Sequence, residues 1–97
     1  MDGLSVGVEE RKLIWRAIVS ERIAQDQKWE KTSTENPLKM LAALVEEVGE
    51  VARAILDSDD DNLITELIQV AAVAVCMLEG KSLGISRVRA VGKVHDR

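Results

Sequence analysis

Apolar residues recur every three or four positions in three stretches of the chain, which predicts three helices. The first helix is expected from about Val8 to Lys28. Its apolar positions are Ile14, Trp15, Ile18, Val19 and Ile23. The polar stretch EKTSTEN follows and is turn-like. Asn36 and Pro37 then mark a helix start, because Asn is a favoured N-cap and Pro is favoured at the first helical position.

The second helix is expected from about Pro37 to Leu56 and divides into two unlike sides. On a helical wheel centred on Val48, its main apolar residues fall within about 60°. They are Leu41, Leu44, Val45, Val48, Val51, Ala52 and Ile55. Glu46 and Glu50 fall near the opposite side, with Glu47 between the two sides. Ala43 and Ala54 flank these acids, so this acidic side is narrow enough to approach another helix closely.

The third helix is expected from about Asp61 to Glu79, after the acidic turn DSDDDN at residues 57–62. Acidic residues at a helix start complement its dipole. The helix is apolar nearly all round, which predicts burial on most sides. Its first half carries one narrow polar line, formed by Asn62, Glu66 and Gln69.

Residues 81–97 have a weak pattern. The stretch SRVRAV is compatible with a short strand, a last helical turn or an arm that reaches a partner. His95 is expected in a disordered tail. The organisation predicted for residues 1–97 is a single domain with its core at about 8–80 and a basic tail at 81–97.

The composition favours an all-α fold, a bundle of three to four helices completed by oligomerisation. Trp15 and Trp29 are the only aromatic residues and there is one proline, whereas strands are usually richer in aromatic residues. A 97-residue chain buries only about 60–65% of its unfolded surface, so burial between subunits would help. The single cysteine, Cys76, is expected in the core and excludes an internal disulfide.

Charge and hydropathy restrict the partners. The net charge is −4, with +4 in residues 81–97 and −8 in the first 80. An acidic body argues against nucleic-acid binding. The longest apolar run spans 12 residues, whereas a membrane helix needs about 20, so a cytoplasmic protein without membrane association is predicted.

The acidic residues of the second and third helices suggest a metal site. If these helices pack antiparallel, Glu66 and Gln69 can face Glu47 and Glu50. Four oxygen-bearing side chains would then converge, and oxygen ligands suit Mg²⁺ or Mn²⁺. A plainer interpretation stays open. The acids of the second helix can form a solvated surface, Gln69 can be a helix–helix hydrogen-bond partner, and Glu66 can lie in an exposed first turn.

The segments EEVGE, at residues 46–50, and ELIQ, at residues 66–69, resemble the E-E-x-x-E … E-x-x-D signature of MazG-like, all-α nucleoside triphosphate pyrophosphatases. The resemblance covers about residues 18–80, and SERIAQDQKWE is similar to the first helix of small MazG-like proteins. It implies a dimer or tetramer that cleaves an NTP or dNTP to the monophosphate and pyrophosphate with Mg²⁺. By position, Glu47, Glu50 and Glu66 match metal ligands, and Glu46 matches the carboxylate that orients or deprotonates the attacking water.

Gln69 departs from this signature, which has Asp there. A glutamine can offer a neutral carbonyl oxygen to the metal, but the site loses one negative charge. A catalytically weak or silent oligomer that binds nucleotide or a partner protein is therefore the alternative function. Phosphoribosyl-ATP pyrophosphohydrolase is a related third option. Lys28 and Arg53 are candidates for binding pyrophosphate and Trp29 for stacking on a base, against plainer roles as surface charges and a core or interface anchor.

Overall fold

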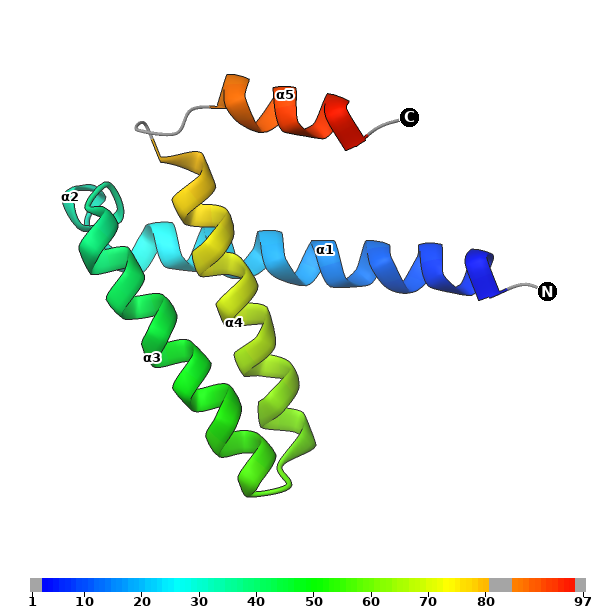
Figure 1. Cartoon of the computed structure of the whole chain (residues 1–97). Coiled ribbons are helices and arrows are strands. Elements are labelled where there is room, and N and C mark those ends of the chain that lie inside the picture. Colours follow the sequence, from blue (N-terminus) through cyan, green and yellow to red (C-terminus); the bar gives the residue numbers. More distant parts are fainter. Residues whose placement is uncertain (1–2, 81–84, 96–97) are drawn as a thin grey trace.

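The structure, a computed structural model, describes residues 3–80 and 85–95, and every element in them is a helix (Figure 1). The helices are α1 (Gly3–Lys28), α2 (Lys31–Thr34), α3 (Pro37–Leu56), α4 (Asp60–Glu79) and α5 (Ile85–His95). The predicted all-α class is confirmed. The three predicted helices correspond to α1, α3 and α4, while the stretch taken as a turn contains the single-turn helix α2.

The basic tail is helical in its described part. Of the three alternatives for SRVRAV, the structure takes a helical one, because residues 86–91 lie inside the eleven-residue helix α5. The backbone of His95 forms the last position of that helix, so the expectation of a disordered tail there is wrong.

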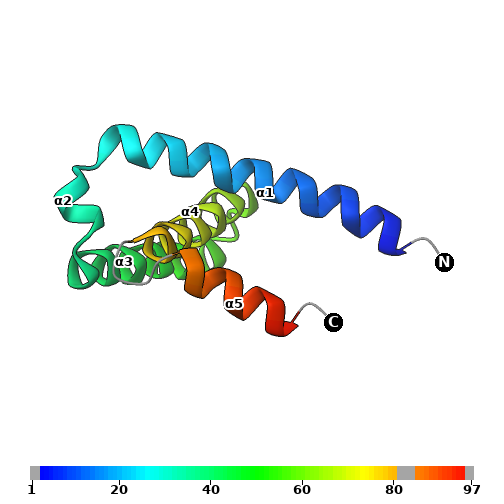
Figure 2. The same cartoon turned by 90° about the horizontal axis from the view of Figure 1, so that it is seen from above.

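Helices α3 and α4 form an antiparallel hairpin, and α1 crosses α4 on one face of it (Figures 1 and 2). The turn between them is tight, with Ser58 in the left-handed region at φ 54°. Asp59 caps α4 by accepting a hydrogen bond from the backbone N–H of Asn62 at 3.1 Å. The core cluster contains Met40, Val73 and Cys76, and its partly buried neighbours are Trp29, Leu44 and Met77.

Helix α3 turns toward α4 the boundary between its apolar stripe and its acidic side, where Glu47 lies. Met40 and Ala54 are buried, and Glu47, Ala43, Leu44 and Val51 are half-buried. Most of the predicted stripe faces outward, since Leu41, Val45, Val48, Ala52 and Ile55 are exposed. The acidic side approaches another helix only in part: Ala54 is 1% exposed and Glu47 is half-buried, whereas Glu46 and Glu50 are exposed.

In one copy of the chain, α1 and α4 bury fewer of their apolar residues than their hydrophobic patterns predict. Of the five apolar residues that mark α1, only Ile18 is buried. In Figure 1 the N-terminal half of α1 extends beyond the edge of α4. In α4 the buried residues are Ala72, Val73 and Cys76, while Ile64, Leu67 and Leu78 are exposed. One copy of the chain does not bury α4 on most sides. The predicted core position of Cys76 is confirmed.

Helix α4 also bears on the expectation about membranes. Within the described residues it is long and apolar enough, by length and composition, to cross a bilayer. The core helix of a soluble protein meets the same criterion. The absence of membrane association therefore stays a prediction from the sequence.

The N-cap of α3 gives a first testable consequence. The side chain of Asn36 accepts hydrogen bonds from the backbone N–H groups of Leu38, at 3.0 Å, and Lys39, at 3.2 Å. We expect Asn36→Ala to lower the free energy of unfolding by about 1 kcal/mol, because these N–H groups lose their partner. Thermal or urea unfolding measures this loss. The matched control is Asn62→Ala, which removes an exposed side chain inside the first turn of α4. Equal losses for the two variants would contradict a capping role for Asn36.

Candidate functional site

Three of the predicted metal ligands lie in contact between α3 and α4. Gln69 on α4 lies between Glu47 on α3 and Glu66 on its own helix. Because both neighbours are acceptors, the amide satisfies them only with its nitrogen turned toward them. In that orientation Gln69 donates to Glu47 Oε2 at 3.1 Å and to Glu66 Oε1 at 2.8 Å. The predicted facing of α3 and α4 through these three residues is observed.

The electrostatics of Glu47 reflect its position. Burial raises the pKa of Glu47, and the neighbouring charges of Glu66, Glu50, Glu21 and Glu46 raise it further. Negative charge is thus concentrated around one half-buried carboxyl group, and the ionised form is disfavoured. A bound cation or a proton would relieve this cost.

The donor set fits a hard cation, although its members do not converge on one point. Among the described side chains, no three Asp, Glu, His or Cys residues are arranged so that they could hold a metal ion. Glu50 is exposed one helical turn after Glu47, and the orientation of Gln69 that satisfies both carboxylates turns its N–H, not its carbonyl oxygen, toward them. The ligand set Glu47, Glu50, Glu66 and Gln69 stays a prediction, which requires rotation of Glu50 and of the Gln69 amide. Its oxygen chemistry suits Mg²⁺ or Mn²⁺.

Glu46, the predicted catalytic carboxylate, lies apart from this contact. It is exposed on α3 and lines a pocket together with Trp29, Ser33, Lys39, Met40 and Ala43. The half-buried Trp29 therefore lies in the same pocket as Glu46, and it also packs against the core cluster. The two roles considered for Trp29, base stacking and packing, are compatible at this position.

The two predicted phosphate-binding cations are both exposed. Lys28 is the last residue of α1. Arg53 follows Glu46 by seven residues on α3, and seven residues are close to two helical turns, so the two side chains share one side of the helix. Arg53 is placed beside Glu46 by this spacing, whereas Lys28 belongs to a different helix end.

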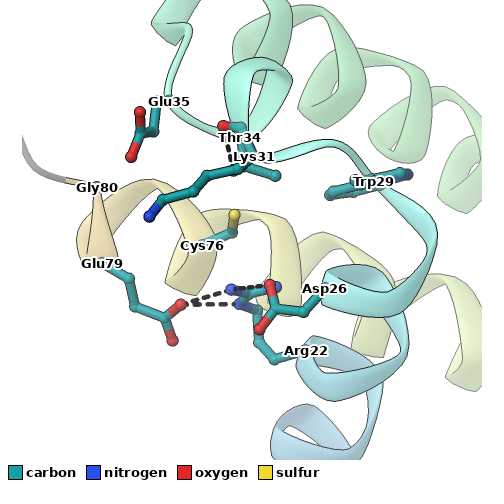
Figure 3. Close-up of a pocket in the computed structure, with 9 residues that line it drawn as sticks. All are labelled: Arg22, Asp26, Trp29, Lys31, Thr34, Glu35, Cys76, Glu79 and Gly80. Atoms are coloured by element: carbon teal, nitrogen blue, oxygen red, sulfur yellow. Dashed lines mark hydrogen bonds and ion pairs between the residues drawn. The ribbon is translucent and has the colours of Figure 1, made fainter.

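A larger pocket of about 430 Å³ lies at the other end of α4 and contains none of the predicted acids (Figure 3). At its base, Arg22 is buried and donates to Glu79 Oε1 from Nε at 3.2 Å and also from Nη2. The same guanidinium donates to Asp26 Oδ1 at 2.8 Å and to Gln25 Oε1 at 3.3 Å. Burial raises the pKa of the adjacent Cys76 thiol. Trp29 lines this pocket and the pocket of Glu46, so the two adjoin.

The sequence interpretation missed several residues around these sites. They are Glu21, Arg22, Gln25, Ser33, Lys39 and Glu79. A signal for two of them was present, because Ile18, Arg22 and Gln25 follow one line at helical spacing. Polar residues on the line of a buried isoleucine indicate a paired interior group. Ser33 and Lys39 had no such signal, since their position depends on how α2 packs.

Comparison with known proteins gives one finding. A family model described as the MazG nucleotide pyrophosphohydrolase domain matches residues 35–97, about two thirds of the chain. No curated protein and no solved structure matches the chain. The matched segment contains α3, α4 and α5 and begins after α1, so the similarity of SERIAQDQKWE to the first helix of such proteins stays a prediction.

The raised pKa of Glu47 predicts a pH-dependent stability in metal-free protein. A carboxyl group whose pKa is raised by folding contributes stability below its unfolded pKa and loses it as pH rises through the folded pKa. We therefore expect Glu47→Gln to gain stability relative to wild type, by a few degrees of Tm, between pH 4 and pH 7 in chelator. Thermal melts across this range measure the difference. Glu10→Gln, at an exposed glutamate of α1, should show a constant difference. A constant difference for Glu47→Gln would contradict this account.

Proposed function

The chain belongs to the MazG nucleotide pyrophosphohydrolase family, and we propose that it is a Mg²⁺-dependent nucleoside triphosphate pyrophosphatase. The reaction converts an NTP or dNTP to the monophosphate and pyrophosphate. The strongest support is the contact between Glu47, Glu66 and Gln69, because it brings the two halves of the acidic signature together across α3 and α4. The proposed role is removal of unwanted or modified nucleotides.

The metal-binding residues of the proposed site are Glu47, Glu50, Glu66 and Gln69, and the metal is Mg²⁺ or Mn²⁺. The raised pKa of Glu47 supports this assignment, because clustered carboxylates disfavour one another's charge until a cation is shared between them. When bound, the metal neutralises negative charge on the phosphate oxygens.

In the proposed mechanism, water attacks the α-phosphorus while the bond from that phosphorus to the bridging oxygen of the β-phosphate breaks. Glu46 accepts the proton of the water as general base. The electron pair of the broken bond leaves with pyrophosphate. Arg53, on the same side of α3 as Glu46, and Lys28 bind the phosphate groups, and Trp29 stacks on the base from the pocket that it shares with Glu46.

The proposed assembly is a homodimer or homotetramer in the cytoplasm, without nucleic acid or membrane as partner. The many apolar residues exposed on a single copy support self-association.

A second candidate function is a catalytically weak or silent oligomer that binds nucleotide or a protein partner. The orientation of Gln69 favours it, because an amide that donates to both carboxylates relieves part of their repulsion without a metal. A metal must then compete with these hydrogen bonds for Glu47 and Glu66.

One assay separates the two functions. We expect the protein to release pyrophosphate from members of a panel of NTPs and dNTPs with Mg²⁺ or Mn²⁺, and not in chelator. Glu46→Gln should lower kcat by about 10²- to 10⁴-fold, the range that a general base contributes. The matched control, Glu10→Gln on α1, should retain the wild-type rate. Nucleotide binding without pyrophosphate release across the whole panel would favour the silent oligomer.

Gln69→Asp tests whether position 69 faces a metal. In chelator we expect the variant to have a Tm several degrees below that of wild type. It loses the two hydrogen bonds of the Gln69 amide and adds a third carboxylate at a half-buried position. Mg²⁺ should raise the Tm of the variant more than that of wild type, since a ligand bound only by the native state stabilises it. Activity should rise with the added charge.

The control for that experiment is Asn62→Asp, the same amide-to-acid change at an exposed position of α4. It should leave the Mg²⁺-induced shift at the wild-type value. Equal Mg²⁺ shifts for wild type and Gln69→Asp would show that this side chain does not face the metal.

A further inference from the structure

The pocket that Trp29 shares with Glu46 is small and follows the first half of α3. Its volume is about 270 Å³, just below the roughly 300 Å³ at which pockets for whole small molecules begin. Trp29 gives it an aromatic wall, and the buried Met40 and half-buried Ala43 give it an apolar lining. The pocket therefore suits the nucleoside part of a nucleotide, with the phosphate groups outside it.

One line of side chains along α3 gives such a nucleotide a direction. The line consists of Lys39, Ala43, Glu46, Glu50 and Arg53. Spacings of four, three, four and three positions keep these residues on one side of the helix. Lys39 precedes Glu46 by about 10 Å along the helix axis, and Arg53 follows Glu46 by the same distance. The aromatic pocket is at the Lys39 end, so a substrate with its α-phosphorus at Glu46 directs its base toward Lys39 and its pyrophosphate toward Arg53.

Lys39 brings a cation to the base end of this line. It is the only cationic residue among the described residues that line the pocket. Its side chain is exposed, and among the described side chains it forms no ion pair. Its backbone N–H is already bonded to the side chain of Asn36, so this N–H is not available to a phosphate. The group that remains for a ligand is the ammonium, with three hydrogen-bond donors and no acceptor.

The other groups of the pocket do not distinguish one base from another. Every base has a π-face, so stacking on Trp29 tolerates all of them. The hydroxyl group of Ser33 can both donate and accept a hydrogen bond. Glu46 faces the attacking water in the proposed mechanism. The choice among bases is therefore left to Lys39.

We propose that Lys39 selects keto bases, so that the substrates are the nucleoside triphosphates of guanine and of uracil or thymine. This inference rests on the proposed function, which places the α-phosphorus at Glu46. Guanine presents the acceptor O6, and uracil or thymine presents O4, where adenine and cytosine carry an amino group. An ammonium group donates to these oxygens but meets N–H groups on the amino bases.

Binding of nucleoside monophosphates tests this selection without turnover. The fluorescence of Trp29 is followed in chelator, in a Trp15→Phe background that removes the other indole. GMP and AMP share their sugar and phosphate, as do UMP and CMP, so the ratio of dissociation constants within each pair reports the base alone. We expect GMP to bind about tenfold more tightly than AMP, and UMP about tenfold more tightly than CMP, for one charged hydrogen bond.

Two substitutions at Lys39 should change these ratios in different ways. Lys39→Met should bring both ratios to unity while the stacking on Trp29 persists. Lys39→Glu should reverse both, because a carboxylate accepts hydrogen bonds from the amino groups of adenine and cytosine. Each variant replaces an exposed side chain, and a glutamate in the first turn of α3 complements the helix dipole. Circular dichroism should therefore show wild-type helix content for both.

The matched control is Lys31→Met. Lys31 is exposed on α2 and lines the larger pocket at the end of α4, not the pocket of Glu46 (Figure 3). This variant should keep both wild-type ratios. If Lys31→Met removes the preference and Lys39→Met does not, the base lies in the larger pocket and the proposal is overturned.

Three other results would overturn the proposal. They are wild-type ratios of unity, a Lys39→Met variant that binds all four monophosphates more weakly by one common factor, and no binding of any monophosphate at millimolar concentration. A common factor would mean that Lys39 binds the phosphate. A protein that prefers GMP and UMP but releases no pyrophosphate from any triphosphate would refute the proposed hydrolysis and leave base selection by Lys39 standing.

Discussion

The contact of Gln69 with Glu47 and Glu66 is a polar link between α3 and α4 within the hairpin. Helix α4 is mostly apolar after its first turn, and the two half-buried residues of its polar line, Glu66 and Gln69, lie toward Glu47 of α3. A half-buried carboxylate and amide need polar partners, because an unpaired polar group away from water costs free energy. The exposed apolar stripe of α3, with Val48 at its middle, offers no such partner. Glu47 does, so the line of α3 that carries Glu47 packs inward.

Packing Glu47 inward places several carboxylates close together, and their repulsion costs free energy in the folded hairpin. Glu47 and Glu66 approach one another with Glu50, Glu21 and Glu46 nearby, and the pKa of Glu47 is raised. Gln69 reduces the repulsion by donating one hydrogen bond to each carboxylate. A cation between the carboxylates would reduce it further, because it carries a positive charge. With an aspartate at this position, the metal-free site would have three mutually repelling groups. In the proposed metal site, the glutamine would therefore lower both the dependence of stability on metal and the affinity for metal.

The sequence predicted the helices better than their packing. The spacing of apolar residues and the Asn36–Pro37 start located α3 and α4 within two residues, because caps and periodicity are local properties. The acidic signature placed Glu47 opposite Glu66 and Gln69 correctly. Periodicity could not decide which line of α3 faces inward, since the exposed line through Val48 and the inward line through Glu47 have the same spacing. The position of Glu21 and the Arg22 network depend on how α1 crosses α4, which no local pattern encodes. For α5, the weak pattern of SRVRAV left strand and helix equally open.

Helix α1 lies before the segment that matches the family, yet it fixes the surroundings of both pockets. Arg22 is buried and binds Glu79 from the last turn of α4, so breaking this pair would leave a buried charge without its partner. The pair therefore holds α1 at one angle across the hairpin. One residue before Arg22, Glu21 adds its charge to the field at Glu47. Seven residues after it, Trp29 forms a wall shared by the pocket of Glu46 and the pocket at the end of α4. Glu21 and Arg22 lie on α1, and Trp29 directly follows its last residue and is tied to it by a hydrogen bond from its backbone N–H to the carbonyl oxygen of Gln25 at 2.8 Å. The Arg22–Glu79 pair therefore helps to position both the charge of Glu21 and the aromatic wall.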